Sequence, residues 1–361
     1  YTRKVFMDYK EPLFWIHLNM DYPFNLKGIL YFPKINTEYD SIEGTIKLYN
    51  NQVFIADNIK EVIPEFLMLL KGVIDCPDLP LNVSRSALQN DGFVKKISDY
   101  ITKKVADKLS GMCKTDKENY EKYWDDISPF IKFGCLKDEK FCEKMSDYVL
   151  FKNLDNKYLT FKEALDENKE KHENTIFYTN DPVQQSQYVN MFKAQGIDAV
   201  ILKDNIDQPF ISQLESKNEG VKFKRIDDEL NDSFTEELSE EDEKSLKEKL
   251  AETFKKALGR DIDIKVQKLK DNKVSSLITV SEETRRMQDM MKMYGMSGMD
   301  PSMFGGAGET LTLNANNALV KYIVDTPEGE NTELICKQLY DLALISHTPL
   351  NPDSMTAFIK K

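Results

Sequence analysis

Short apolar runs separated by polar turns fill the first sixty residues, a pattern typical of β-strands. Lys27–Pro33 is predicted to be a short buried strand, and Ile46–Tyr49 and Val53–Ile55 alternate apolar and polar positions with a period of two. A bulge near Asn50–Asn51 would reset the register and turn four apolar side chains inward: Ile46, Leu48, Val53 and Ile55. Phe54 would then point to the other face, where the simplest expectation is packing under a helix.

Helical spacing of the apolar positions replaces this alternation further along the chain. One helical face covers residues 59–70, with Pro64 expected to start a fresh segment within it. A long amphipathic helix is predicted over residues 93–112, because its apolar side chains recur at intervals of three and four. Residues 119–136 continue the helical character, and Trp124 is expected to lie in the core.

Strands and helices alternate after residue 173. Strands are predicted at residues 175–179, 197–202 and 221–226, and helices at residues 182–195 and 207–216. Because each crossover carries a helix, we expect a small α/β unit with parallel pairing. Thr179–Asp181 lacks the glycines of a phosphate-binding loop, which argues against a nucleotide-binding Rossmann unit.

A strongly acidic run, Asp227–Glu248, contains eleven acidic residues and is predicted to be a solvated linker that marks a domain boundary. Within it, Ser239 is a suitable N-cap for a helix that ends near Gly259. A polar Lys-Asp-Asn-Lys turn separates two predicted strands, which indicates a hairpin of residues 263–269 and 274–280. Three further helices are predicted to finish the chain, at residues 315–324, 333–346 and 352–361.

The composition supports substantial cores, since 41% of the 361 residues are hydrophobic and 11% are aromatic. This length is sufficient for two or three domains. The net charge of −12 argues against a nucleic-acid partner. No apolar run approaches the roughly 20 residues that cross a membrane, so a membrane partner is not expected either.

Five scattered cysteines show neither the pairing of a disulfide framework nor the spacing of a zinc site. The simplest compartment for such a chain is a reducing cytoplasm, and no metal site is expected. Because the chain begins at Tyr1, we expect it to be a piece of a longer protein that lacks an N-terminal part.

The stretch Leu79–Gln89 is the first candidate for chemistry. Pro80 favours an extended or turning backbone before it, and Ser84 can cap a helix that begins at Arg85. Arg85 and Gln89 then lie one turn apart on the same face. A guanidinium beside the positive end of a helix suits an incoming phosphate, whereas the simpler alternative is a surface salt bridge.

A methionine-rich segment is the second candidate, since seven of the fourteen methionines lie between Met287 and Met303. Helical spacing places four side chains on one face: Met287, Met290, Met291 and Tyr294. Methionine is flexible and polarizable, and it recurs on surfaces that accept many partners. Core packing is the competing interpretation.

A broad apolar stripe marks the helix predicted at residues 333–346, formed by Leu334, Ile335, Gln338, Leu339, Leu342 and Ile345. So small a terminal domain cannot cover this stripe by itself. The simplest partner is a symmetric second copy of the chain.

Several ordered motifs resemble the Hsp90 family of chaperones in its bacterial form. They include Asp78–Gln89 (DLPLNVSRSALQ), Ile46–Asn58 (IKLYNNQVFIADN), Tyr9–His17 (YKEPLFWIH) and Lys27–Lys34 (KGILYFPK). Further along the chain, IFYTND, GIDAVIL and the methionine-rich segment follow in the family's order. The methionine-rich segment lacks the tryptophan-containing run of eukaryotic members.

This resemblance implies specific roles. Arg85 would reach the γ-phosphate of ATP, which is bound with Mg mainly in a separate N-terminal domain, and Gln89 would assist nearby. Phe54 would be a partly exposed aromatic that contacts unfolded or partly folded client proteins. The methionine face, with Met293, would be a second client-binding surface. Leu339, Leu342 and Ile345 would lie in a constitutive homodimer, and cooperation with the Hsp70 system is implied as well.

The resulting expectation is an α/β (α+β) chain. Residues 1–230 would form a middle domain, with a large α/β part over 1–115, a helical connector over 116–170 and a small α/β part over 171–230. Residues 231–361 would form a small α+β dimerisation domain. Two alternatives are a passive scaffold without ATP coupling and an enzyme complete in itself. For the latter the sequence offers no catalytic constellation, because His17, His172 and His347 are isolated.

Overall fold

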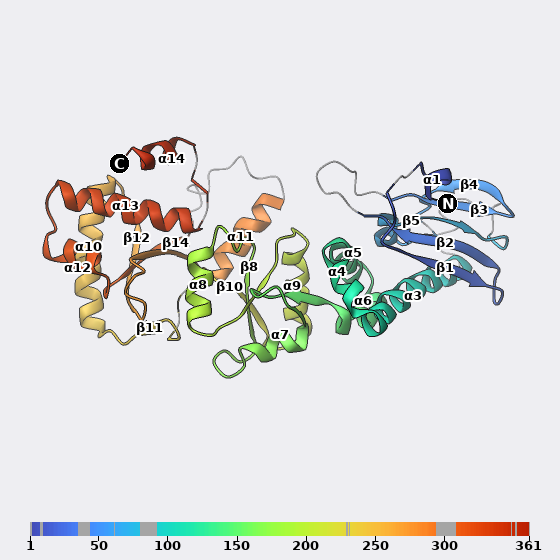
Figure 1. Ribbon diagram of the computed structural model, residues 1–361, viewed down its shortest axis with the longest axis horizontal. Helices are drawn as coiled ribbons and strands as arrows, with labels where there is room; N and C mark the ends of the chain where they lie inside the picture. Colours follow the sequence, from blue (N-terminus) through green and yellow to red (C-terminus); the bar gives the residue numbers. More distant parts are fainter. Residues whose placement is uncertain are drawn as a thin grey trace. The chain divides into compact units, whose positions relative to one another are not determined.

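The computed structural model describes residues 2–7, 10–34, 44–60, 62–79, 92–228, 230, 232–293, 308–347, 349–350 and 352–360 (Figure 1). These residues form a mixed α/β structure, as predicted. The chain divides into two compact units. The first consists of Tyr1–Leu150 and Asp204–Leu214, and the second of Phe151–Lys203 and Glu215–Lys361.

A five-stranded sheet forms the centre of the first unit. Its order is β1-β2-β5-β3-β4, and its strands are β1 (Phe14–Met20), β2 (Leu26–Phe32), β3 (Ile46–Asn50), β4 (Val53–Asp57) and β5 (Lys71–Asp75). Neighbouring strands are antiparallel except for β3 and β5, which run parallel. The alternation along β1 buries one face of the strand and leaves Trp15 exposed on the other.

The β3–β4 hairpin follows the prediction only in part. The apolar side chains of β3 are buried, and the register shifts between Leu48 and Tyr49, slightly before the predicted bulge. Asn51 and Gln52 then make the turn, with φ values of 49° and 66°. Because the shift occurs before the turn, Val53 is exposed, and its predicted inward position is wrong.

Helices make up the rest of the first unit: α1 (Thr2–Val5), α3 (Gly92–Thr115), α4 (Lys117–Lys122), α5 (Trp124–Lys137) and α6 (Glu139–Met145). Two 3-10 turns accompany them, η1 (Glu65–Leu69) and η2 (Ser146–Tyr148). The predicted long amphipathic helix is confirmed as α3, whose apolar stripe is buried. Trp124 lies in the core, as expected.

The predicted helix over residues 59–70 is wrong apart from the single turn η1. Pro64 has an extended backbone, with φ −53° and ψ 140°, and this conformation cannot continue a helix. The apolar residues are buried nevertheless. Phe66 packs against Phe130 and Phe141, with ring centroids 5.7 and 4.8 Å away. The spacing of the apolar residues therefore indicated correctly that they are buried, but not that they form a helix.

The second unit contains a small parallel sheet of order β10-β8-β9. Its strands are β8 (Thr175–Thr179), β9 (Ala199–Ile201) and β10 (Lys222–Arg225), and its crossovers contain α8 (Ser186–Ala194) and α9 (Asp207–Lys217). Most of α9 belongs to the first unit. A short two-stranded sheet and a helix precede this sheet, β6 (Leu150–Lys152), β7 (Tyr158–Thr160) and α7 (Phe161–Glu167). The predicted parallel α/β arrangement is confirmed.

A four-stranded sheet of order β11-β12-β14-β13 follows. Its strands are β11 (Thr235–Glu236), β12 (Asp263–Leu269), β13 (Ser276–Val280) and β14 (Glu309–Asn314). The accompanying helices are α10 (Glu240–Leu258), α11 (Glu282–Met293), α12 (Ala318–Asp325), α13 (Glu330–His347) and α14 (Pro352–Ile359). As predicted, Ser239 caps α10, and Gly259 ends it with a left-handed backbone.

The predicted hairpin of residues 263–269 and 274–280 is wrong, although both strands exist. The missed strand β14 lies between them, parallel to β12 and antiparallel to β13. The buried Asn314 side chain holds the connection from β12 to β13. It accepts from the N–H of Leu269 at 2.9 Å and donates to the carbonyls of Asp271 and Val274 at 2.9 and 2.7 Å.

The acidic run Asp227–Glu248 was predicted to be solvated throughout, and this is wrong for its first residue. Asp227 is fully buried, and its carboxylate accepts from Arg225 Nε at 2.7 Å and lies 2.7 Å from a terminal nitrogen of Arg285. The predicted boundary near residue 230 falls within the second unit. There one hydrophobic cluster joins the small parallel sheet to β12 and β13 through Leu230 and Phe234.

Candidate functional site

Arg85 and Gln89, the predicted phosphate-facing pair, lie outside the described residues, as does Ser84. The structure describes the chain on both sides of them. It reaches Leu79, four residues after the end of β5, and resumes at Gly92, the first residue of α3. The described residues of the candidate site are those that contact the chain near Leu79 and near Gly92.

The first end is fastened by two neighbouring turns. The backbone N–H of Asn25 donates to Asp78 Oδ2 at 2.7 Å, and its side-chain amide donates to the same oxygen at 3.3 Å. From the β3–β4 hairpin, Asn50 Nδ2 donates to the carbonyls of Pro77 and Leu79 at 3.1 and 3.3 Å. The backbone before Leu79 is thus held from two sides.

The second end is fastened by aromatic packing. Phe93, in the first turn of α3, packs edge-on against the buried ring of Phe24, with centroids 5.4 Å apart. Two turns further along α3, Tyr100 contacts the same ring at 6.1 Å and donates its hydroxyl hydrogen to the carbonyl of Asn19 at 3.0 Å. Adjacent residues Phe24 and Asn25 therefore hold both ends of the segment that carries Arg85.

The base of this segment offers no chemistry of its own. Burial, reinforced by the nearby charges of Asp78 and Asp75, raises the pKa of the Cys76 thiol to about 11, so this cysteine is not a thiolate nucleophile at neutral pH. Within the described residues, no group of three His, Cys, Asp or Glu side chains could hold a metal ion. Arg85 and Gln89, which lie outside the described residues, stay the predicted candidates for phosphate chemistry in this region.

Phe54 lies at the surface and does not pack under a helix. Its ring is 49% exposed, forms an edge-on contact with Tyr49 at 5.6 Å and lies 5.5 Å from the ammonium group of Lys47. An exposed aromatic on an edge strand of the sheet is available to a partner.

The methionine face is described only at its start. Met287 on α11 is 47% exposed, while the side chains of Met290, Met291 and Met293, and the whole of Tyr294, lie outside the described residues. Exposure of Met287 favours a surface role at that position over core packing.

Polar residues that the sequence reasoning missed fix the base of α11. Arg286 pairs with Glu215 at 2.5 Å and with Glu282 at 3.0 Å. Glu282 also accepts from the Tyr178 hydroxyl at 2.8 Å, and Arg285 is 2.8 Å from its other oxygen. The sequence Glu-Glu-Thr-Arg-Arg at the start of α11 was a visible sign of ion pairs. Helical spacing alone, however, cannot identify the partners that these arginines find elsewhere in the chain.

Arg285 links this group to the buried carboxylate of Asp227. His347, the last residue of α13, has Nδ1 2.9 Å from its carboxylate, and Gln185 donates to it at 3.1 Å. Burial would raise the pKa of Asp227, but the hydrogen bonds of Arg225 and His347 and the charge of Arg285 outweigh it and hold the pKa well below its usual range. The carboxylate thus stays ionised and ties α11 and the end of α13 to the small parallel sheet.

The apolar stripe of α13 is divided between core and surface. Leu339 is 1% exposed and belongs to the unit's own hydrophobic core. Leu334 and Leu342 are 43% and 47% exposed, and Ile345 is half-buried. The part of the stripe that can meet another chain therefore includes Leu342 and excludes Leu339.

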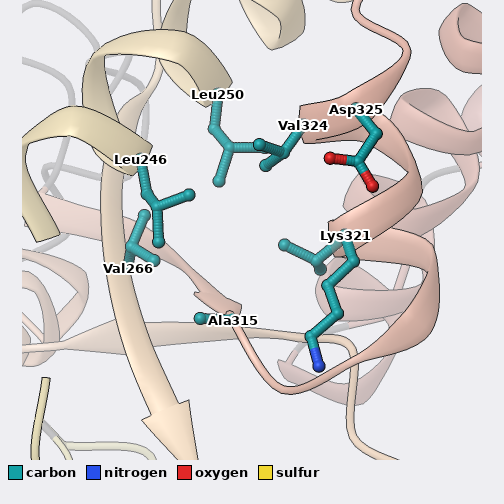
Figure 2. Close-up of a pocket in the computed structure, with 8 residues that line it drawn as sticks. Leu246, Leu250, Val266, Ala315, Lys321, Val324 and Asp325 are labelled. Carbon is teal, nitrogen blue, oxygen red and sulfur yellow. The ribbon is translucent and has the colours of Figure 1, made fainter. Parts of the chain in front are cut away.

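A small apolar pocket of about 240 Å³ opens between α10, β12 and α12 (Figure 2). Leu246, Leu250, Val266 and Val324 line it, and Lys321 and Asp325 stand at α12. It is smaller than usual ligand sites, which start at roughly 300 Å³, and it lacks a glycine-rich loop for phosphates. It therefore does not replace the site around Arg85.

Comparison with known proteins agrees with the motifs described above. The family model described as Hsp90 protein matches residues 1–360. The chain belongs to the Hsp90 family. The family resemblance inferred from the sequence is therefore confirmed.

Several bacterial Hsp90 proteins named Chaperone protein HtpG are similar to this chain. The protein of Bacteroides thetaiotaomicron is 40% identical over 337 residues, which cover 88% of this chain and 48% of that protein. The Porphyromonas gingivalis protein is 38% identical over 357 residues, covering 93% of this chain and 51% of its own length. The chain thus spans about half the length of these relatives. Among its described helices, none combines the length and apolar character needed to cross a membrane.

Proposed function

We propose that this chain forms the middle and C-terminal parts of an ATP-dependent Hsp90 chaperone. The observation that carries the proposal is the fastening of both ends of the Arg85 segment to Phe24 and Asn25. The described backbone on either side of the segment is held in place, and such fixed ends would help Arg85 to act on a nucleotide bound elsewhere.

Arg85 contributes charge to the reaction. ATP with Mg is held mainly by a part of the protein outside this chain, and there it supplies the phosphoryl group that water attacks. The guanidinium of Arg85 stabilises the negative charge that develops on the γ-phosphate, and Gln89, predicted from the sequence to lie one helical turn away, assists it. The guanidinium also links the two parts of the protein in the ATP-bound state.

Client proteins contact two surfaces in this proposal. The exposed aromatic of Phe54 and the methionine face at Met287, Met290, Met291 and Met293, with Tyr294, accept apolar segments of unfolded or partly folded chains. Support comes from the exposure of Phe54 and Met287. The adaptable thioethers suit clients that differ in sequence.

A homodimer completes the proposal. The exposed part of the α13 stripe, with Leu342 and Ile345, forms the seam, while Leu339 supports it from within the core. A second copy of the same stripe covers these side chains by two-fold symmetry.

Replacing Arg85 in the full-length protein tests the ATP role. Arg85→Ala should lower kcat for ATP hydrolysis by about tenfold or more with little change in KM, because an arginine that acts on developing charge stabilises the transition state more than the bound substrate. Gln89→Ala should cause a smaller loss of the same kind. Arg260→Ala removes an arginine of the second unit and serves as the matched control. Unchanged turnover in Arg85→Ala would favour a scaffold without ATP coupling.

A further inference from the structure

The backbone that leads into the Arg85 segment is held by side chains and backbone groups from two other turns. Between the end of β5 and Leu79, five separate contacts reach it from two turns that are distant in sequence. Two come from Asn25 and two from Asn50, and the backbone N–H of Gln52 adds a fifth by donating to Asp75 Oδ2 at 3.0 Å.

Asp78 provides the acceptor on one side. Its Oδ2 takes both donors of Asn25, and the shorter of the two bonds comes from a backbone N–H, which no substitution at position 25 other than proline removes. Phe24, the preceding residue, is buried against Phe93 of α3. The Asp78 carboxylate at the first end is thereby bonded to Asn25, the direct neighbour of the residue that packs against the second end.

Asn50 provides the donors on the other side. Its amide reaches two carbonyls of the connection, those of Pro77 and Leu79, so it fixes the direction of the chain and not only its position. Asn50 is the last residue of β3. The residue before it, Tyr49, accepts with its carbonyl from the N–H of Cys76 at 3.0 Å, and its ring contacts Phe54. The hairpin that carries the exposed aromatic therefore also aligns the connection.

We infer that Asp78 and Asn50 are positioning residues for Arg85, an inference that rests on the proposed function of that arginine. They contact no nucleotide themselves. Their hydrogen bonds hold the backbone from Pro77 to Leu79, six residues before Arg85, and this fixed approach is what would keep the guanidinium in its working position. A small misplacement of such a group lowers turnover without weakening substrate binding.

Variants of Asp78 in the full-length protein test this inference through steady-state ATP hydrolysis. Asp78→Ala should lower kcat about threefold to tenfold with KM for ATP unchanged, as expected for the loss of a hydrogen-bond acceptor. Asp78→Asn keeps an oxygen that accepts from Asn25, so it should restore most of the activity. Asn50→Ala should lower kcat in the same range. Asp99→Ala, which removes another exposed aspartate paired with Lys140, is the matched control.

A double variant separates positioning from a general loss of stability. In the Arg85→Ala background, Asp78→Ala should have no further effect on kcat, because its contribution acts through the missing guanidinium. Wild-type kcat in Asp78→Ala, an equal loss in Asp78→Asn, or a full additive loss in the double variant would overturn the inference while leaving the role of Arg85 intact. Unchanged kcat in Arg85→Ala alone would overturn the proposed function and this inference together.

Discussion

At the scale of single residues, the buried carboxylate of Asp227 is the feature least visible in the sequence. It stands first in the stretch Asp227–Glu248, which contains eleven acidic residues and where a solvated position is the ordinary expectation. Burial becomes possible because Arg225 and Arg285 lie against it and Gln185 donates an amide hydrogen. Only the folded arrangement of separate elements brings these groups together.

Asp227→Asn should strongly destabilise the second unit. The substitution leaves the guanidinium groups of Arg225 and Arg285 without their shared counter-charge, and breaking a buried ion pair in this way costs about 3–5 kcal/mol. Urea denaturation measures the free energy of unfolding, with Asp242→Asn on the exposed start of α10 as control. A loss below about 1 kcal/mol, the range of surface pairs, would contradict the prediction.

The same carboxylate should make stability depend on pH. Its pKa is lower in the folded state than the value of about 3.9 in an unfolded chain. The stabilisation is therefore complete above the unfolded pKa and is lost as the pH falls toward the folded one. Unfolding free energies of the wild type should fall between pH 5 and pH 3, and the slope should be smaller in Asp227→Asn. Equal slopes would place the acid sensitivity in other carboxylates.

At the scale of elements, local signals predicted the helices and strands better than their pairing. Ser239 and Gly259 mark the ends of α10 because capping depends on residues near each end. The hairpin of β12 and β13 was wrong because β14 returns from about thirty residues later to lie between them. No short-range pattern reports such a return. The segment that carries Arg85 was singled out by its motif and stays a prediction, whereas the contacts of Asn25 and Asn50 beside it depend on tertiary structure.

Replacing Met287, Met290, Met291 and Met293 of α11 together by serine should leave the fold intact. Surface substitutions change stability by roughly 0.5 kcal/mol or less, so the melting temperature should move by only a few degrees. Suppression of the aggregation of a denatured client should fall, because the adaptable apolar surface is removed. The same four positions changed to leucine provide the control that keeps an apolar face.

Two outcomes would contradict this prediction for α11. A collapsed melting transition in the serine variant would mean that the methionines are packed in a core, where each loss costs about 2–5 kcal/mol. Undiminished suppression of aggregation with an intact fold would direct attention to Phe54 as the main client surface.

At the scale of the whole molecule, the apolar stripe of α13 has one buried edge and one exposed edge. One edge, with Leu339, closes the core of the second unit, and the other, with Leu342, remains exposed. Sequence periodicity predicted the stripe but could not divide it, since both edges have the same composition. The division decides which substitution probes assembly and which probes folding.

Leu342→Glu should therefore separate the proposed dimer into monomers, because two charges would be buried without partners in an apolar seam. Leu339→Ala should instead lower the free energy of unfolding by about 2–5 kcal/mol through a cavity in the core. Light scattering at micromolar concentration measures the first effect and denaturation the second. Leu319→Glu, at another exposed leucine, is the control for added charge. A Leu342→Glu variant that remains dimeric would place the seam elsewhere.

The pairing of β13 with β14 has a consequence for how this part of the protein can change. Val280 and Glu309 are partners in the ladder, so the chain leaves the sheet and rejoins it at the same rung, with α11 and the methionine-rich stretch between. The whole excursion is an insertion at one point of an otherwise continuous sheet. Beyond the ion pairs of Arg285 and Arg286, which fix the start of α11, its length and sequence can therefore diverge, or be exchanged for those of a relative, while the strands on either side keep their register.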